Sequence, residues 1–87
     1  MVQLSLEDIE FIKILATSDA TILELGMNDS TRRRLDEQLG VILRQYYREN
    51  TTNSQKIWTV EFEKHGITED QGKSAIACAR RLGLDIS

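Results

Sequence analysis

Proline is absent from this chain of 87 residues, and cysteine and histidine occur once each. One cysteine cannot form a disulfide within the chain, so a reducing compartment, the cytoplasm, is the expected localisation. The single histidine, His65, has no second imidazole and no clustered cysteines with which to share a metal ion. Phosphate-binding glycine loops and nucleophile–base pairs are also missing. We therefore expect no metal, no cofactor and no enzyme activity.

Long apolar runs are missing too. The longest, residues 75–79, falls far short of the roughly 18 to 20 residues that a membrane span needs, so we expect no membrane partner. Residues 1–5 lack the charged start and apolar core of a signal peptide. No linker, repeat or low-complexity segment divides the sequence, which is 40% hydrophobic and 29% charged. This composition and length predict one small folded domain over residues 1–87.

Charge is distributed unevenly along the chain, although the net charge is only −3. Residues 1–29 hold one lysine against six acidic side chains, a net charge of −5. Residues 30–56 hold six basic against three acidic side chains (+3), and residues 57–87 hold four against five (−1). A polyanion responds to the local potential within a Debye length, so the middle third is the part suited to one.

Capping residues and apolar spacing predict the first helices. Ser5 can cap a helix that runs to about Ala16, and Asp19 can cap a short second helix over residues 20–25 that Gly26 ends. A third helix follows, and three polar residues could each cap it: Asn28, Asp29 and Ser30.

The course of the chain after Leu39 has two interpretations. One long helix could run from Asp29 to about Arg48, or Gly40 could end the helix and leave strands over residues 41–48 and 56–63. The second segment has the period-two alternation of a half-buried strand, in Trp58, Val60 and Phe62. A strand needs a neighbour to satisfy its backbone, so this pattern favours the hairpin.

A last helix is predicted from about Glu69 to Leu82. Thr68 and Gln71 form a capping box before it, and Gly83 closes it. One face carries small or apolar residues that would let another helix approach closely, within the domain or in a dimer: Ala75, Cys78, Ala79 and Leu82. We expect Cys78 to be a buried structural thiol, because nothing basic beside it would lower its pKa.

The order of these elements resembles a winged helix-turn-helix domain. Residues 25–31 (LGMNDST) look like the turn that these DNA-binding families share, and residues 32–36 (RRRLD) are similar to the opening of their recognition helix. The resemblance implies an α+β, mostly helical fold: a helix-turn-helix core at about 5–40, a wing hairpin at 41–65 and an added helix at 68–83. Arg32 departs from the family, which usually places valine there. The alternative is an all-α domain of four to five helices.

This resemblance implies sequence-specific binding of duplex DNA by a small transcriptional regulator, dimeric through the last helix. The implied nucleic-acid contacts come from the third helix and the wing: Ser30, Thr31, Arg32, Arg33, Arg34, Arg48, Asn53 and Lys56.

A rival hypothesis from another class is a protein-interaction module that docks on a larger complex, of the kind that phages or plasmids encode. Its docking surface would be the acidic face of the first helix, at Glu7, Asp8 and Glu10, which suits a basic partner.

Overall fold

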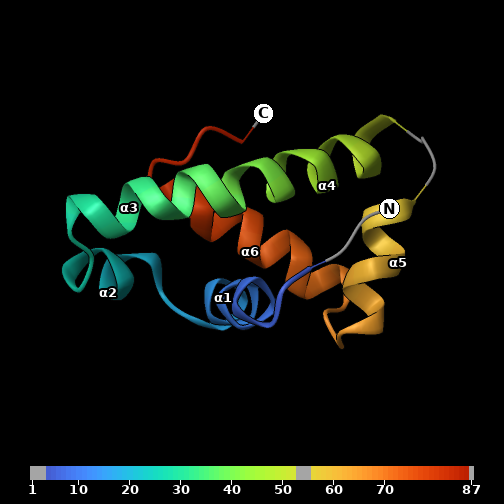
Figure 1. Cartoon of the computed structure of the whole chain (residues 1–87), viewed down its shortest axis with the longest axis horizontal. Helices are drawn as coiled ribbons and strands as arrows, with labels where there is room; N and C mark the ends of the chain where they lie inside the picture. The colour runs from blue at the N-terminus through green and yellow to red at the C-terminus, as the bar shows by residue number, and fades with distance from the viewer. Residues whose placement is uncertain (1–3, 53–55, 87) are drawn as a thin grey trace.

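The computed structural model describes residues 4–52 and 56–86, and within these ranges the chain forms helices and no strand. The helices are α1 (Leu6–Thr17), α2 (Ala20–Leu25), α3 (Asp29–Leu35), the π-helical segment η1 (Asp36–Gly40), α4 (Val41–Thr52), α5 (Ile57–Lys64) and α6 (Glu69–Arg81). Since α3, η1 and α4 follow each other without a break, the described chain has five continuous helices (Figure 1). The fold is the all-helical alternative, and the predicted α+β winged helix is wrong.

The helix starts confirm the capping predictions. Ser5 Oγ accepts a hydrogen bond from the Asp8 amide, and an Asp19 carboxylate oxygen accepts one from the Thr21 amide. Of the three candidate caps for α3, Asn28 performs the task, with its side-chain oxygen 2.7 Å from the Thr31 nitrogen. The capping box of Thr68 and Gln71 is present before α6. These contacts join neighbours in sequence, which explains why local patterns predict them.

Gly40 does not end the third helix, which was the premise of the hairpin. The glycine is buried within the π-helical turn, and a Cβ there would lie 3.0 Å from an Asp36 carboxylate oxygen and 3.3 Å from an Arg44 nitrogen. The apolar stripe of Leu35, Leu39, Leu43 and Tyr46 continues at helical spacing on both sides of it, and all four residues are buried. Burial of this stripe stabilises one long helix more than the glycine weakens it.

The predicted second strand is helix α5, so the described residues of the predicted wing, 41–52 and 56–65, contain no strand. Phe62 is buried and Trp58 half-buried, but Val60 is 51% exposed, which breaks the expected alternation. The start of α5 is held by Glu49 of α4, whose carboxylate accepts hydrogen bonds from the amides of Trp58 and Thr59 and from the Thr59 hydroxyl at 2.8–3.0 Å. The carboxylate thereby satisfies amides that have no partner within α5 itself.

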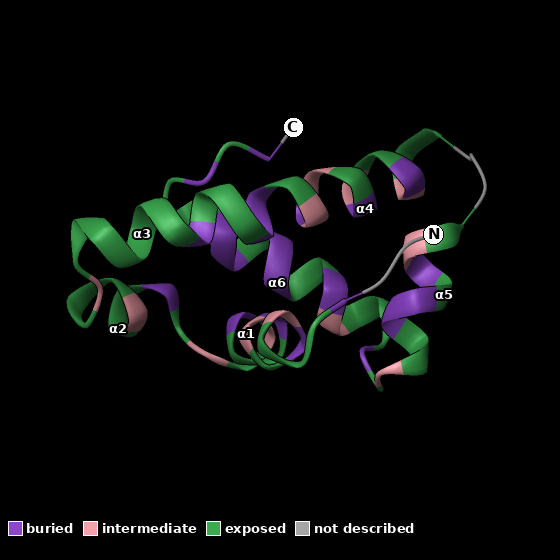
Figure 2. Cartoon of the chain, in the orientation of Figure 1, coloured by how far each residue is buried: buried purple, intermediate pink, exposed green. Residues whose placement is uncertain are grey.

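Helix α1 is viewed almost end-on in Figure 1, below α6 and on the side of α6 away from α4, and its most extensive packing is against α6. The predicted small-residue face of α6 is buried: Ala75, Cys78, Ala79 and Leu82. Figure 2 shows buried residues along the side of α6 that faces the other helices. This face packs inside the domain, so these four side chains are not open for a dimer contact.

An aromatic pair forms the junction of α4, α5 and α6. The rings of Tyr46 and Phe62 stack with centroids 4.3 Å apart and planes 12° apart. On the other side of Tyr46 lies Gly72, where an added Cβ would come within 2.5–2.8 Å of the phenol ring. Burial raises the pKa of Tyr46, so the phenol stays neutral well into the alkaline range. Gly72 is therefore required by close packing.

We predict that Gly72→Ala destabilises the domain by about 1–3 kcal/mol, because the buried ring of Tyr46 cannot move away from the new methyl group. The matched control is Gly26→Ala, at a glycine with φ of −94° whose added Cβ would have its nearest neighbour at 3.9 Å. Urea denaturation should show a lower midpoint for Gly72→Ala and a nearly unchanged midpoint for Gly26→Ala. Equal midpoints would contradict this packing.

We also predict that Glu49→Gln lowers the free energy of unfolding by about 1–3 kcal/mol. The substitution makes a buried charged acceptor of three hydrogen bonds neutral and removes one of its oxygens. Glu37→Gln, at an exposed position of the same long helix, is the control. Amide hydrogen exchange should accelerate selectively at Trp58 and Thr59. Unchanged protection at these two amides would show that Glu49 does not support α5.

Candidate functional site

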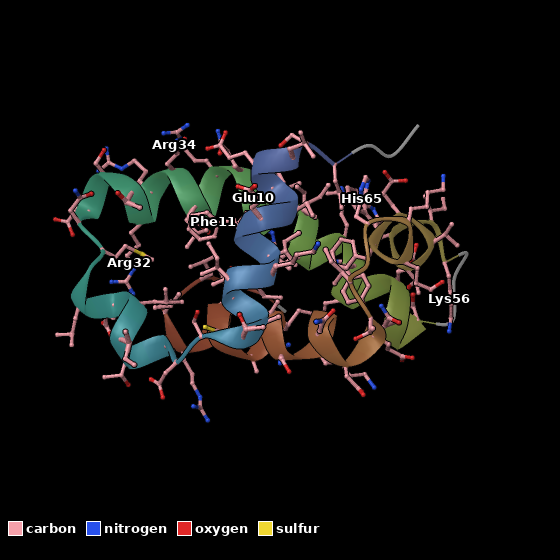
Figure 3. The ribbon with its side chains drawn as sticks, turned by 90° about the horizontal axis from the view of Figure 1, so that it is seen from below. Glu10, Phe11, Arg32, Arg34, Lys56 and His65 are labelled. Carbon is pink, nitrogen blue, oxygen red and sulfur yellow. The ribbon has the colours of Figure 1, made fainter. Side chains whose placement is uncertain are left out.

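The residues that the winged-helix resemblance assigned to nucleic acid are not brought together. Ser30, Thr31 and Arg33 are exposed in α3, at one end of a molecule whose longest dimension is 36 Å. Lys56 precedes α5 at the other end, opposite Arg32 and Arg34 in Figure 3. Arg48 lies on α4 and not on a wing, and Asn53 falls outside the described residues. These positions do not form one continuous basic surface.

Arg32 is directed at the protein's own backbone. Its guanidinium donates a hydrogen bond to the carbonyl of Leu82, which follows the last residue of α6, and it lies against Gly83. The carbonyls at a helix C-terminus lack partners within the helix and carry partial negative charge, so a cation is well suited to this position. Gly83 has a φ of +94° and leaves room for the guanidinium. This role explains why an arginine can stand where winged helices bury a valine.

Two further arginines hold the segment that follows α6. Arg44 of α4 donates to the Asp85 carbonyl at 3.0 Å, and Arg80 of α6 donates through Nε to the Ile86 carbonyl at 2.9 Å. Leu84 and Ile86 in this segment are buried. The three guanidiniums thus satisfy backbone carbonyls of residues 82–86 while apolar side chains anchor the same segment in the core.

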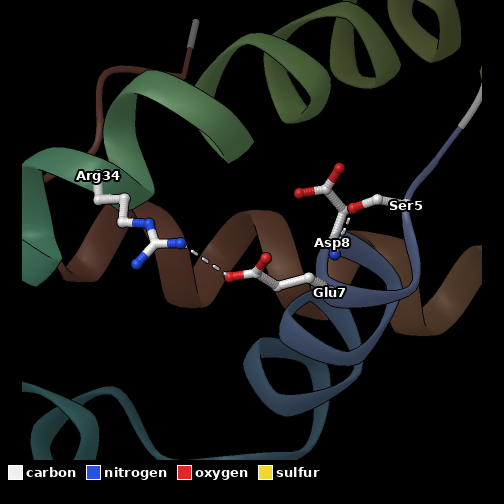
Figure 4. Close-up of polar contacts among 4 residues, drawn as sticks. All are labelled: Ser5, Glu7, Asp8 and Arg34. Atoms are coloured by element: carbon white, nitrogen blue, oxygen red, sulfur yellow. Dashed lines mark hydrogen bonds and ion pairs between the residues drawn. The ribbon is translucent and has the colours of Figure 1, made fainter.

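Arg34 is the remaining arginine of the triplet with a partner in the protein. Its guanidinium lies 3.3 Å from a Glu7 carboxylate oxygen, which links α3 to the first turn of α1 (Figure 4). Both side chains are more than two-thirds exposed, so the pair adds little to stability and can exchange partners readily.

Beneath this ion pair, a groove of about 100 Å³ separates α1 from α3 and η1. Phe11, half-buried, forms its floor with Leu35 and Leu39, while Glu7 and Asp8 stand at its rim. The volume holds about three water molecules, which is room for one apolar side chain but not for a metabolite. The groove thus combines apolar side chains with two carboxylates.

The single cysteine and the single histidine lie on different elements, Cys78 in α6 and His65 directly after α5. Burial raises the pKa of the Cys78 thiol, which keeps it protonated and a poor nucleophile, in keeping with the structural role expected for it. His65 Nε2 lies 3.3 Å from a Glu61 carboxylate oxygen, one turn earlier in α5. Among residues 4–52 and 56–86, no three histidine, cysteine or acidic side chains are placed to hold a metal ion.

The sequence patterns did not identify several of the residues that build these sites. Arg44 and Arg80 reach carbonyls 41 and 6 residues further along the chain, and no local pattern predicts such contacts. The groove also joins elements far apart in sequence. The sequence did indicate Glu7 and Asp8 as an acidic docking face, and it placed Phe11 beside the buried stripe of Ile9, Ile12 and Leu15.

Comparison with known proteins provides no further guide: no family model, curated protein or solved structure matches the chain. In the part of the chain that the structure describes, no helix is both long and apolar enough to cross a membrane.

We predict that Arg32→Ala lowers the free energy of unfolding by about 1 kcal/mol, because it leaves the Leu82 carbonyl without its charged donor. Arg33→Ala, the neighbouring substitution of an exposed arginine, should leave stability within about 0.5 kcal/mol of the wild type. Chemical denaturation of the two variants measures the difference. If both unfold at the wild-type midpoint, the contact with Leu82 contributes nothing.

Proposed function

We propose that this chain is a protein-interaction domain that holds a basic, apolar segment of a partner protein in the groove between α1 and α3–η1. The observation that carries the proposal is the combination of a partly uncovered Phe11 with carboxylates at the rim of the same groove. An apolar side chain of the partner would contact Phe11, while an adjacent lysine or arginine would pair with Glu7 or Asp8.

The ion pair between Arg34 and Glu7 supports this function, since it is exposed and weak. A guanidinium from a partner can take the place of Arg34 beside Glu7 at little cost. The segment that supplies the α1 side of the groove favours the same class of partner, because residues 1–29 carry a net charge of −5. The electrostatic field of such a negative charge accelerates the encounter with basic proteins and repels polyanions.

DNA binding, the function implied by the winged-helix resemblance, has less support. The described part of the chain contains no wing to grip the flanking backbone, and Arg32 and Arg34 are engaged with Leu82 and Glu7. Arg33 remains exposed near Ser30 and Thr31. Arg48 and Lys56 lie far from it. We therefore treat duplex DNA as the competing outcome of the experiment.

A displayed library of random dodecapeptides, selected on the immobilised protein, tests the proposal. We expect enrichment of sequences that place arginine or lysine beside a large apolar residue. A synthetic peptide of this kind should bind about fivefold to thirtyfold more weakly to Glu7→Gln/Asp8→Asn, since one or two charge pairs are lost and each is worth roughly 1 kcal/mol near the surface. The affinity should also fall as salt is added.

The control is Glu69→Gln/Asp70→Asn. It removes two carboxylates from the first turn of α6, where one of them, Glu69, also forms an exposed ion pair. Equal affinity of both double variants, or enriched peptides without basic residues, would overturn the proposal. Salt-sensitive binding of a duplex oligonucleotide that disappears in Arg33→Ala would support the DNA-binding regulator instead.

A further inference from the structure

A second and more apolar hollow lies on the other side of α6, between α6 and α4. Its volume is about 290 Å³, and its floor and walls include Tyr47, Ile76 and Ala77. The polar residues of its α4 wall turn toward their own helix: Asn50 donates to the Tyr46 carbonyl and Thr51 to the Tyr47 carbonyl. The wall therefore presents hydrocarbon to the hollow.

Two cations stand on the α6 side of this hollow. Lys73 and Arg80 both line it, on the same helix face as Ala77 and two turns apart, which corresponds to about 10 Å along the axis. Lys73 has only an exposed ion pair with Glu69 at 3.6 Å. A ligand carboxylate can replace this weak partner readily.

Arg80 is held in a fixed orientation. Its Nε donates to the Ile86 carbonyl, and its guanidinium lies over the ring of Tyr47 at 4.4 Å from the centroid. The two terminal nitrogens make no hydrogen bond or ion pair within residues 4–52 and 56–86. A guanidinium whose position is already fixed loses little entropy on binding a carboxylate, and the terminal nitrogens are the donors such a bond needs.

We infer that the α4–α6 hollow is a docking site for an amphipathic helix of a partner protein that carries two acidic residues seven positions apart. On a helix, residues i and i+7 lie on one face about 10 Å apart, which matches the separation of Lys73 and Arg80. Apolar residues at i+3 and i+4 of the same face would contact Ile76, Ala77 and Tyr47. This site shares no residue with the groove at α1, so its test is independent of the proposed function.

The probe is a fluorescein-labelled helical peptide with the pattern Glu-x-x-Leu-Leu-x-x-Glu, titrated with the protein and followed by fluorescence anisotropy. Two comparison peptides replace both glutamates by lysine or move the second glutamate to i+5, off the binding face. We expect saturable binding of the first peptide and binding at least tenfold weaker for both others. Equal or tighter binding of the lysine peptide would overturn the inference.

Protein variants assign the binding to this hollow. Ala77→Glu places a bulky negative side chain on the exposed floor and should abolish binding, while Lys73→Ala should weaken it about fivefold. Ser74→Glu adds the same charge at an exposed position of α6 that does not line the hollow and is the control. Circular dichroism confirms that each variant folds. If Ala77→Glu is folded and still binds the peptide like the control, the site lies elsewhere and the inference is wrong.

Discussion

The continuity of the helix from Asp29 to Thr52 determines where almost every other part of the molecule lies. It carries the basic triplet at one end and Glu49 near the other, and the buried stripe between them sets the side against which the remaining helices pack. Without this continuity, Glu49 could not reach the start of α5, and Tyr46 could not lie between Phe62 and Gly72. A break at Gly40 would separate these contacts. The π-helical turn instead keeps the glycine inside one helix.

Three arginines of this sequence bind the protein's own backbone. Arg32 and Arg44 come from the long helix and Arg80 from α6, and each donates a hydrogen bond to a backbone carbonyl of residues 82–86. Their charge still contributes to the local potential, but their donors and positions serve the fold. A count of basic residues in the sequence therefore overestimates what the surface offers to a phosphate backbone.

The sequence was sufficient for features that depend on near neighbours. Ser5, Asp19 and Thr68 cap the helices that they were expected to cap, and Cys78 is buried as predicted. The sequence was insufficient where a segment was locally compatible with both a strand and a helix. Trp58, Val60 and Phe62 suit a strand by their alternation, yet a carboxylate ten residues earlier supplies the start of a helix, and only the tertiary structure brings that carboxylate there. The two grooves, each built from separate helices, could not be predicted for the same reason.

The dominant packing of α1 on α6 has a consequence for synthesis of the protein. A ribosome that has extended the nascent chain as far as Lys64 has produced α1 through α5, but the main partner of α1 has not been made. Ile12 and Leu15, which are fully covered in the finished fold, then lack most of their neighbours. Contacts between residues this far apart in sequence form late, so we expect the core to be completed only after α6 has been synthesised.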